Sequence, residues 1–249
     1  MALEELERAA GLLSTARHIV ALTGAGISKD SGLPTFREAQ TGLWARYRPE
    51  DLATPEAFAR QPDVVWRWYA WRRSLVEAAV PNAGHVALAA MQRAAAAFTL
   101  VTQNVDGLHR RAGSTDAIEL HGDITRIRCS ACGLVHRRHG PGEPPRCDAC
   151  GGHLRPDVVW FGEMLPEDAL RRATAAAVGC DVLLSVGTSG VVYPAAGLVG
   201  IAARSGAVII VVNPEPDAGV PDAIHLRGSA SDVLPGLVAM AWPGHRARS

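Results

Sequence analysis

"HIVALTGAGIS" (residues 18–28) joins a short apolar strand to a glycine-rich turn. Further along the chain, alanine-rich segments of helical character separate several apolar runs of strand length. These runs span residues 97–104, 117–122, 181–189, 207–215 and 223–230. Nearly continuous apolar strands that alternate with helices are typical of a parallel sheet covered on both faces. The sequence therefore predicts an α/β fold with a doubly wound parallel sheet.

Polar and glycine-rich residues follow each predicted strand. The segments "TGAGIS", "TQNVDG", "LHGD", "GTS", "NPE" and "GSA" stand at the carboxyl ends of the six runs. In open α/β sheets, ligands bind in the crevice outside those ends. We therefore expect one site that is assembled from nearly every strand.

Two segments interrupt this alternation and predict a smaller lobe within a single domain of residues 1–249. Residues 33–82 are loop-rich and then helical, and residues 123–155 hold four cysteines among Gly, Pro and Arg. The large lobe would then comprise residues 1–32, 83–122 and 156–249. Ahead of the first strand, residues 3–17 predict an amphipathic helix with its apolar positions at Leu3, Leu6, Ala10 and Leu13.

Composition narrows the class of protein. Of the 249 residues, 48% are hydrophobic and 20% are charged, which is typical of a globular domain. Lys+Arg and Asp+Glu both number 25, so no basic excess favours a nucleic-acid backbone. The acidic, amphipathic N-terminus does not resemble a signal peptide, and Arg204 and Gly206 interrupt the apolar stretch near the C-terminus. We expect a cytoplasmic protein that does not span a membrane.

The cysteines predict a metal site. Cys129-x2-Cys132 and Cys147-x2-Cys150 are separated by fourteen residues, a spacing typical of tetrahedral zinc. Disulfides are the alternative, but they are rare in cytoplasmic proteins. Four protein ligands leave no open position on the metal, so we expect one structural zinc. The fifth cysteine, Cys180, lies in an apolar run and is expected to be a small buried residue.

Several strand-end residues have a chemical and a purely structural interpretation. Gly24 and Gly26 would let backbone N–H groups approach a pyrophosphate, or they simply form a tight turn, because the third glycine of the usual fingerprint is absent. His121, Asn104 and Asp106 would each, taken alone, be a structural residue. Three polar strand ends together favour a shared cleft.

The order and spacing of these motifs resemble the sirtuin family. The resemblance rests on "GAGISKDSGLPTFR", "TQNVDGLH", "ELHGD", the four cysteines, "VVWFGE", "GTS" and "NPE", and it extends from about residue 10 to 240. It implies an NAD-dependent protein-lysine deacylase with a Rossmann-like large lobe and a smaller zinc-ribbon and helical lobe. The substrate and NAD would meet between the lobes.

The resemblance also implies roles for individual residues. Phosphates would lie on the glycine turn and on "GTS", nicotinamide and its ribose near residues 103–106, and adenosine near residues 213–230. The implied NAD-binding residues are Gly24, Ala25, Gly26, Asp30, Phe36, Arg37, Gln103, Asn104, Asp106, Gly187, Thr188, Ser189, Asn213, Glu215 and Ala230. An extended substrate peptide would add as a strand beside residues 158–163, with Val159, Phe161, Gly162 and Glu163 as its binding residues.

The implied catalytic residues are His121 and Asn104. His121 would act as a general base on a ribose hydroxyl, since an imidazole has an ordinary pKa near working pH. Asn104 would orient the ribose and a water molecule. The products would be free lysine, nicotinamide and an O-acyl-ADP-ribose.

"VWRWYAWRRS" (residues 65–74) predicts a helix with two ridges. Trp68 and Trp71 lie on the first ridge and are most simply core residues. Tyr69 and Arg72 are i, i+3 neighbours on the second ridge, so both can point at one object. On spacing alone, a solvated Arg72 and a half-buried Tyr69 are the simpler interpretation of the pattern.

The resemblance favours a functional interpretation of that pair. Sirtuins of class III are similar in carrying Tyr-x-x-Arg at this point, where it binds the carboxylate of succinyl- or malonyl-lysine. Thr35 in "PTFR", where many deacetylases have Asp, also fits that class. We therefore expect deacylation of acidic acyl-lysines, with weaker deacetylation.

Other functions stay open at this stage. They are plain deacetylation, mono-ADP-ribosylation, and a non-enzymatic nucleic-acid module that would use the zinc ribbon and the Trp/Arg helix. We expect acyl-lysine proteins or peptides as partners, no nucleic acid, and a monomer. The sequence does not distinguish between succinyl, malonyl and glutaryl groups.

Overall fold

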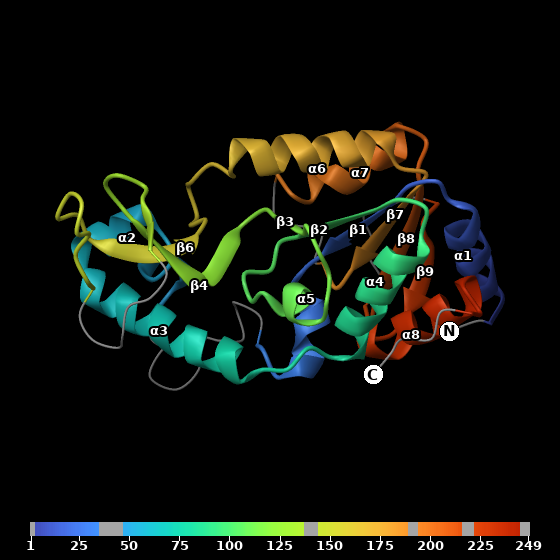
Figure 1. Ribbon diagram of the computed structural model, residues 1–249, viewed down its shortest axis with the longest axis horizontal. Coiled ribbons are helices and arrows are strands. Elements are labelled where there is room, and N and C mark those ends of the chain that lie inside the picture. Colours follow the sequence, from blue (N-terminus) through green and yellow to red (C-terminus); the bar gives the residue numbers. More distant parts are fainter. Residues whose placement is uncertain (1–2, 35–46, 137–143, 189–193, 216–221, 245–249) are drawn as a thin grey trace.

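A computed structural model of the chain describes residues 3–34, 47–136, 144–188, 194–215 and 222–244. Six parallel strands form its main sheet, in the order β3-β2-β1-β7-β8-β9 (Figure 1). The strands are β1 (Ile19–Thr23), β2 (Phe98–Thr102), β3 (Ile118–Glu119), β7 (Val182–Val186), β8 (Val208–Asn213) and β9 (Ile224–Arg227). Each falls inside one of the six predicted apolar runs, so the predicted parallel sheet is confirmed.

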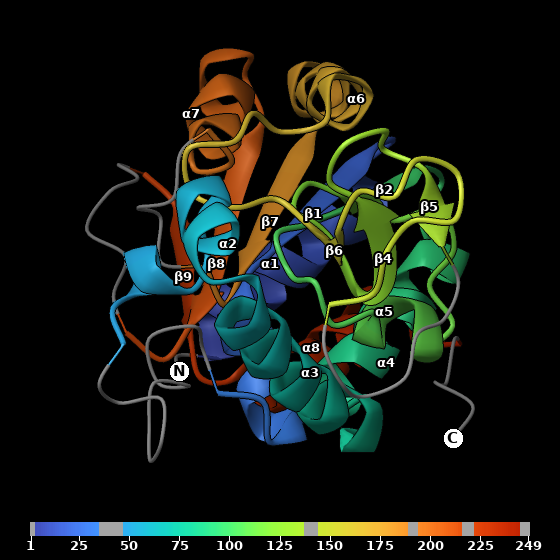
Figure 2. The ribbon, with the colours of Figure 1, turned by 90° about the vertical axis from the view of Figure 1, so that its left-hand side faces the viewer.

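Helices cover both faces of this sheet, which explains why its central strands are apolar throughout. On one face lie α1 (Leu3–Thr15), α4 (Ala83–Ala94) and α8 (Ala230–Ala241). On the other lie α6 (Glu167–Gly179) and α7 (Gly197–Arg204), seen above the sheet in Figure 2. Leu6, Ala10 and Leu13 of α1 are buried as predicted, but Leu3 is exposed because it begins the helix, beyond the edge of the core.

A second, three-stranded antiparallel sheet has the order β5-β4-β6. Its strands are β4 (Gly122–Cys129), β5 (Val135–His136) and β6 (Leu154–Val158), and α2 (Pro55–Arg60) and α3 (Pro62–Ala78) lie beside it (Figure 1). Three short helical segments, η1 (Ala25–Ser31), η3 (Pro49–Asp51) and α5 (Leu108–Arg111), complete the described elements.

The predicted strand of residues 117–122 is divided between the two sheets, which corrects the sequence interpretation. Only Ile118 and Glu119 pair with β2, and the next strand begins at Gly122 in the small sheet. Gly122 has a φ of +80°, a conformation that side-chain-bearing residues rarely adopt. The chain therefore passes from one sheet to the other within the few residues that include His121.

Helix α3 buries parts of both predicted ridges. Trp68 and Tyr69 are buried in a cluster with Trp160 and Ile124, whereas Trp71 is only partly buried at its margin. Arg72 is partly exposed. The second ridge therefore contributes its tyrosine to the core of the small sheet and leaves its arginine near the surface.

No helix in the part of the chain that the structure describes is long and apolar enough to cross a bilayer.

Candidate functional site

The polar residues that follow the parallel strands come together at one edge of the main sheet. Thr23 at the end of β1 is in register with Thr102 of β2 on one side and with Val186 of β7 on the other. The turns after these strands therefore begin at the same level, and the predicted convergence of strand ends is confirmed.

The glycine turn packs directly on the turn that follows β7. The N–H of Gly24 donates to the carbonyl of Val186 (3.0 Å) and that of Gly26 to the carbonyl of Gly187 (2.9 Å). A Cβ on Gly24 or Gly26 would lie 2.9 or 2.7 Å from the Gly187 oxygen. The two glycines are thus required by contact between backbones, and their N–H groups are already bonded. The exposed Ala25 between them has no hydrogen bond from its N–H within the described residues, so this turn can still receive an anionic group such as a pyrophosphate.

His121 has the hydrogen-bond geometry of a general base. Its Nδ1 lies 2.8 Å from the carbonyl oxygen of Gln103, which only accepts hydrogen bonds, so the ring proton resides on Nδ1. Nε2 then carries the lone pair. Burial lowers the pKa of His121 against the opposing effect of the Gln103 carbonyl, and the ring is neutral at physiological pH.

Asn104 and Asp106, which follow Gln103 after β2, are held by a buried network around Ser28. The Asn104 Nδ2 donates to the carbonyl of Gly24 (3.1 Å) and to Ser28 Oγ (3.2 Å). Ser28 Oγ donates to Asp106 Oδ2 (2.7 Å), and the other Asp106 oxygen accepts from the N–H of Leu108 (2.9 Å). Burial raises the pKa of Asp106. Ser28 is a site residue that our sequence analysis missed, although it lies in the glycine motif.

Two buried histidines extend this network, and the sequence analysis missed them as well. The N–H of Asn82 donates to His85 Nδ1 (3.3 Å), so the proton of His85 is on Nε2, which faces Ser28 Oγ at 3.4 Å. His109 Nε2 donates to Thr23 Oγ1 (2.9 Å), and the two rings meet edge to face with centroids 4.9 Å apart. The available signal was "NAGH", a helix N-cap followed by a histidine at its third position.

The residues expected around adenosine lie at the ends of β7, β8 and β9. Asn213 Nδ2 donates to the carbonyl of Thr188 (3.1 Å), Glu215 is exposed, and Ala230 begins α8 against Gly84. Asp30 is exposed in η1. The predicted residues Phe36, Arg37 and Ser189, and also Thr35, lie outside the described residues.

The segment expected to bind a peptide, residues 158–163, is a turn in which most backbone N–H groups already donate hydrogen bonds within the protein. Val159 donates to the carbonyl of His121 (2.9 Å) and Phe161 to that of Ala53 (2.9 Å), while the N–H of Glu163 closes the turn on Trp160. The carbonyl of Val159 and the N–H of Gly162 form no backbone hydrogen bond with another described residue, so these two groups could pair with a peptide strand.

Arg155 braces this turn from the preceding strand. Its guanidinium forms a fork with both oxygens of Glu163 (2.5 and 2.9 Å) and lies 3.3 Å from the centroid of the Trp160 ring. A buried fork of this kind is rigid as well as strong. The Trp160 Nε1 in turn donates to the hydroxyl of Tyr69 (3.0 Å), so the turn and helix α3 are connected.

Tyr69 and Arg72 lie close enough for each side chain to influence the pKa of the other. Burial raises the pKa of Tyr69 to about 12, partly opposed by the positive charge of Arg72. Burial lowers the pKa of Arg72, opposed by Tyr69 and Asp106. The Tyr69 hydroxyl accepts from Trp160 and keeps its own proton at physiological pH, so it can donate that proton to an acceptor next to Arg72.

The four cysteines form a compact cluster that fits zinc. Their sulfurs lie within 4.8 Å of one another, with 3.4 Å between those of Cys129 and Cys150 and 3.8 Å between those of Cys132 and Cys147. Zn–S bonds of about 2.3 Å in a tetrahedron put sulfurs about 3.8 Å apart, whereas a disulfide requires about 2 Å. The N–H groups of Cys132 and Ala131 lower the pKa of Cys129, which favours the thiolate that zinc requires. Cys180 is buried and free elsewhere, as predicted.

The fold and this site define a class of protein: a doubly wound α/β domain with a strand-end site and a cysteine ribbon beside it. The sequence pattern of the Sir2 family matches residues 24–194. The chain belongs to the Sir2 (sirtuin) family.

Relatives and solved structures agree with this assignment. NAD-dependent protein deacylase 2 of Pyrobaculum aerophilum is 55% identical over 232 residues, which is 92% of this chain and 93% of that protein. NAD-dependent protein deacylase 1 of Pseudomonas aeruginosa is 53% identical over 94% of this chain and 98% of its own. A Sir2 homologue in complex with NAD has a TM-score of 0.91 at 46% identity, covering 96% of this chain and 95% of the other. A Sir2 protein bound to a myristoylated histone peptide has a TM-score of 0.78 at 35% identity, covering 96% and 97%.

Zinc removal should destabilise the protein. Among the described residues, the buried cluster around the cysteines consists of Cys129, Cys147 and Leu154, so we expect a metal to stabilise this part of the fold in place of a hydrophobic core. We expect one zinc per chain by metal analysis, and a Tm lower by about 10 °C after chelation, at roughly 2–4 °C per kcal/mol for a domain of this size. Cys147→Ser should lose the zinc, while Cys180→Ser should keep it. An unchanged Tm after complete zinc removal would contradict a structural metal.

Acidic pH should unfold the protein through its two buried histidines. Burial lowers the pKa of His85 to about 4 and that of His109 to about 3, helped for His109 by the neighbouring His85. Below pH 6.5 these two histidines become protonated in the unfolded chain but stay neutral in the folded protein. The free energy of unfolding therefore falls as the pH is lowered to about 3–4. Each histidine contributes about 1.4 kcal/mol per pH unit.

The test is urea denaturation between pH 4.5 and 7.5. His109→Gln keeps a donor for Thr23 and should show a shallower pH dependence than the wild type. His225→Gln, on β9, is the matched control. Equal slopes for the wild type and His109→Gln would show that His109 is not held neutral by the fold.

Proposed function

We propose that this protein is an NAD-dependent protein-lysine deacylase that transfers the acyl group to ADP-ribose. The observation that carries the proposal is the tautomer of His121, whose Nδ1–H is committed to Gln103 and whose Nε2 is left as a base at the strand-end site. The names of relatives more than 50% identical over nearly the whole chain support the same activity.

The residues of the site can each perform one part of this reaction. NAD, when bound, supplies an electrophilic ribose carbon, a leaving nicotinamide and the hydroxyl that accepts the acyl group. His121 Nε2 takes the proton of that hydroxyl, and its lowered pKa keeps it unprotonated until then. Asn104, fixed by Gly24 and Ser28, orients the ribose. The overall reaction consumes one water and gives free lysine, nicotinamide and O-acyl-ADP-ribose.

We propose that NAD lies across the strand ends in the arrangement implied by the family. The turn of Gly24 to Gly26 and residues 187–189 would hold the phosphates. Asn213, Glu215 and Ala230 would contact adenosine. Asp30, Phe36 and Arg37 would belong to a loop over the cofactor, and Gln103 and Asp106 would line the nicotinamide end. Two observations support this arrangement. Hydrogen bonds from Gly24 and Gly26 fix the glycine turn while Ala25 stays exposed, and Asn213 donates to the carbonyl of Thr188, which connects the ends of β7 and β8.

The substrate would be an extended acyl-lysine peptide beside residues 158–163, with Val159, Phe161, Gly162 and Glu163 as its binding residues and with the carbonyl of Val159 and the N–H of Gly162 as backbone partners. Glu163 would act indirectly, because its carboxylate is bonded to Arg155. The proposal also includes a division into two lobes, a large one of residues 1–32, 83–122 and 156–249 and a small one of residues 33–82 and 123–155. It further includes a monomeric state and a cytoplasmic location.

We further propose that the acyl group is acidic, of the succinyl or malonyl type. Arg72 would bind its terminal carboxylate and Tyr69 would donate a second hydrogen bond, with the tyrosine oriented by Trp160. Acetyl-lysine offers no carboxylate, so it would be a weaker substrate.

His121→Ala should abolish NAD-dependent deacylation. Loss of a general base costs about 10²- to 10⁴-fold in rate, measured by mass spectrometry of an acyl-peptide with and without NAD. His225→Ala, on the opposite side of the sheet, is the control and should retain the wild-type rate. Full activity of His121→Ala would refute the assigned mechanism, and transfer of ADP-ribose to protein without deacylation would refute the assigned reaction.

Arg72→Met should separate acidic from neutral acyl groups. Removing a charged hydrogen bond is worth about 1.5–3 kcal/mol, so desuccinylation should fall about 10- to 100-fold while deacetylation changes less than about 3-fold. The assay compares acetyl-, malonyl-, succinyl- and glutaryl-lysine in one peptide sequence. Arg67→Met is a matched control, because Arg67 is exposed on α3 and its Nε donates to the Asp63 carbonyl of the same helix. Equal losses on all four peptides would show that Arg72 does not recognise the acyl carboxylate.

A further inference from the structure

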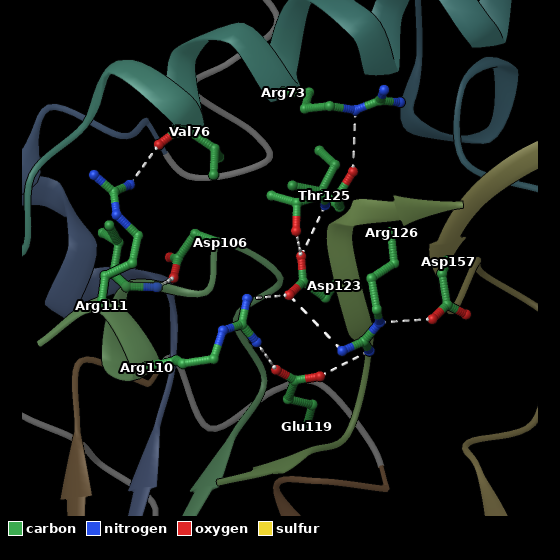
Figure 3. Close-up of polar contacts among 12 residues, drawn as sticks. Arg73, Val76, Asp106, Arg110, Arg111, Glu119, Asp123, Thr125, Arg126 and Asp157 are labelled. Carbon is green, nitrogen blue, oxygen red and sulfur yellow. Dashed lines mark hydrogen bonds and ion pairs between the residues drawn. The ribbon is translucent and has the colours of Figure 1, made fainter. Parts of the chain in front are cut away.

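Four charged side chains close a ring around the crossover between the two sheets. Glu119 ends β3 in the main sheet, and Asp123 is the second residue of β4 in the small sheet. Arg110 of α5 and Arg126 of β4 each reach both carboxylates, as Figure 3 shows. The two acidic residues flank His121 at two residues before it and two residues after it.

The distances show that both arginines bridge. Arg110 Nη1 lies 3.3 Å from Glu119 Oε1 and its Nη2 lies 2.9 Å from Asp123 Oδ2. Arg126 Nη2 lies 2.8 Å from Glu119 Oε2 and its Nη1 lies 3.8 Å from Asp123 Oδ2. A guanidinium can span two carboxylates with its separate nitrogens, which are held in a rigid planar fork. The Nε of Arg126 also donates to Asp157 of β6 (3.0 Å), so the ring continues into the small sheet.

Asp123 is the buried member of the ring. Its side chain is 1% exposed, whereas the Arg110 side chain is 56% exposed. Burial alone would raise the pKa of Asp123, but hydrogen bonds from Thr125 and Arg110 hold it below its usual value. A carboxylate that is buried and ionised depends on every partner it has, because an unpaired buried charge is strongly unfavourable.

Backbone contacts anchor the segment inside the ring on both sides of the histidine: the N–H of Leu120 donates to the carbonyl of Thr102 (2.9 Å), and Gly122 pairs with Val158. His121 is held by its Nδ1–H bond to Gln103 and by its carbonyl, which accepts from Val159. Gly122 follows with a φ of +80°, and a Cβ there would collide with the carbonyl of Asp157. The direction of the His121 ring therefore depends on the path of the backbone between Glu119 and Asp123 as well as on the bond to Gln103.

We propose that the ring of Arg110, Glu119, Asp123 and Arg126 is a positioning device for His121. By tying together the two carboxylates that flank the histidine, it fixes the crossover and directs Nε2 toward the ribose hydroxyl. The four residues are positioning residues and touch no substrate. The proposal rests on the general-base role of His121 in the proposed function.

The first test is kinetic and uses Arg110→Gln, Glu119→Gln and the double variant. Both side chains are more exposed than that of Asp123, and Glu119→Gln also preserves the shape of the side chain, so the fold should tolerate these changes better than a change at Asp123. We expect kcat to fall about 10-fold in each single variant, with the KM for NAD and for peptide within about 2-fold of the wild type. Because both changes break the same bridge, the double variant should lose no more than either single one.

Arg172→Gln provides the matched control. Arg172 is a residue of α6 that lies outside the ring, and its Nη2 is 3.1 Å from Asp116 Oδ2. Its side chain is about as exposed as that of Arg126. Its kcat should equal that of the wild type. The proposal is overturned if the ring variants lower the Tm but keep kcat, if they raise KM alone, or if the double variant multiplies the two losses to about 100-fold.

The second test does not depend on activity. In a sample with ¹⁵N-labelled histidine, the Nδ1–H signal of His121 is assigned by its loss in His121→Ala. Arg110→Gln and Glu119→Gln should shift or broaden it, and Arg172→Gln should leave it in place. An unchanged signal in both ring variants overturns the positioning role, whether or not the enzyme is active. A wild-type protein that shows no NAD-dependent deacylation would instead overturn the proposed function, and this spectrum would still decide the role of the ring.

Discussion

The parallel pairing of β1 on both of its edges is the constraint on which the rest of the site depends. Thr23 is level with Thr102 and with Val186, so the turns after three strands must share one small space. Only glycines satisfy the resulting contact, because a Cβ on Gly24 or Gly26 would strike the backbone of Gly187. The close packing of these turns leaves the polar groups of the neighbouring strand ends facing a common edge.

Burial then sets the protonation states of that edge. His121, His85 and His109 are all driven towards the neutral form, and Asp106 towards a higher pKa, because charge is poorly solvated there. A backbone carbonyl, a backbone N–H and a hydroxyl select the tautomers of His121, His85 and His109 respectively. The three histidines therefore present neutral donors and acceptors of fixed direction, while Glu119 and Asp123 lie at the junction with the small sheet, where arginines pair with them.

The small sheet is stabilised by a different balance of forces. Its core cluster relies on a few large aromatic residues, namely Trp68, Tyr69 and Trp160, together with the cysteine cluster at its far end. Arg155 fixes the turn after β6 through Glu163 and the Trp160 ring. Aromatic packing, a buried ion pair and a metal together replace the continuous apolar strands that stabilise the main sheet.

The sequence by itself determined the six parallel strands, the common edge of their ends and the zinc site, because apolar runs and cysteine spacing are local patterns. It did not reveal that residues 117–122 belong to two sheets, since the change of sheet depends on a positive φ at Gly122. Tertiary structure alone decided that Ser28, His85 and His109 join Asn104 and Asp106 in one network, and that Glu119 and Asp123 share two arginines. Those partners are distant in sequence or on different elements, and only the packing of the two sheets brings their charges and hydrogen-bonding groups within reach.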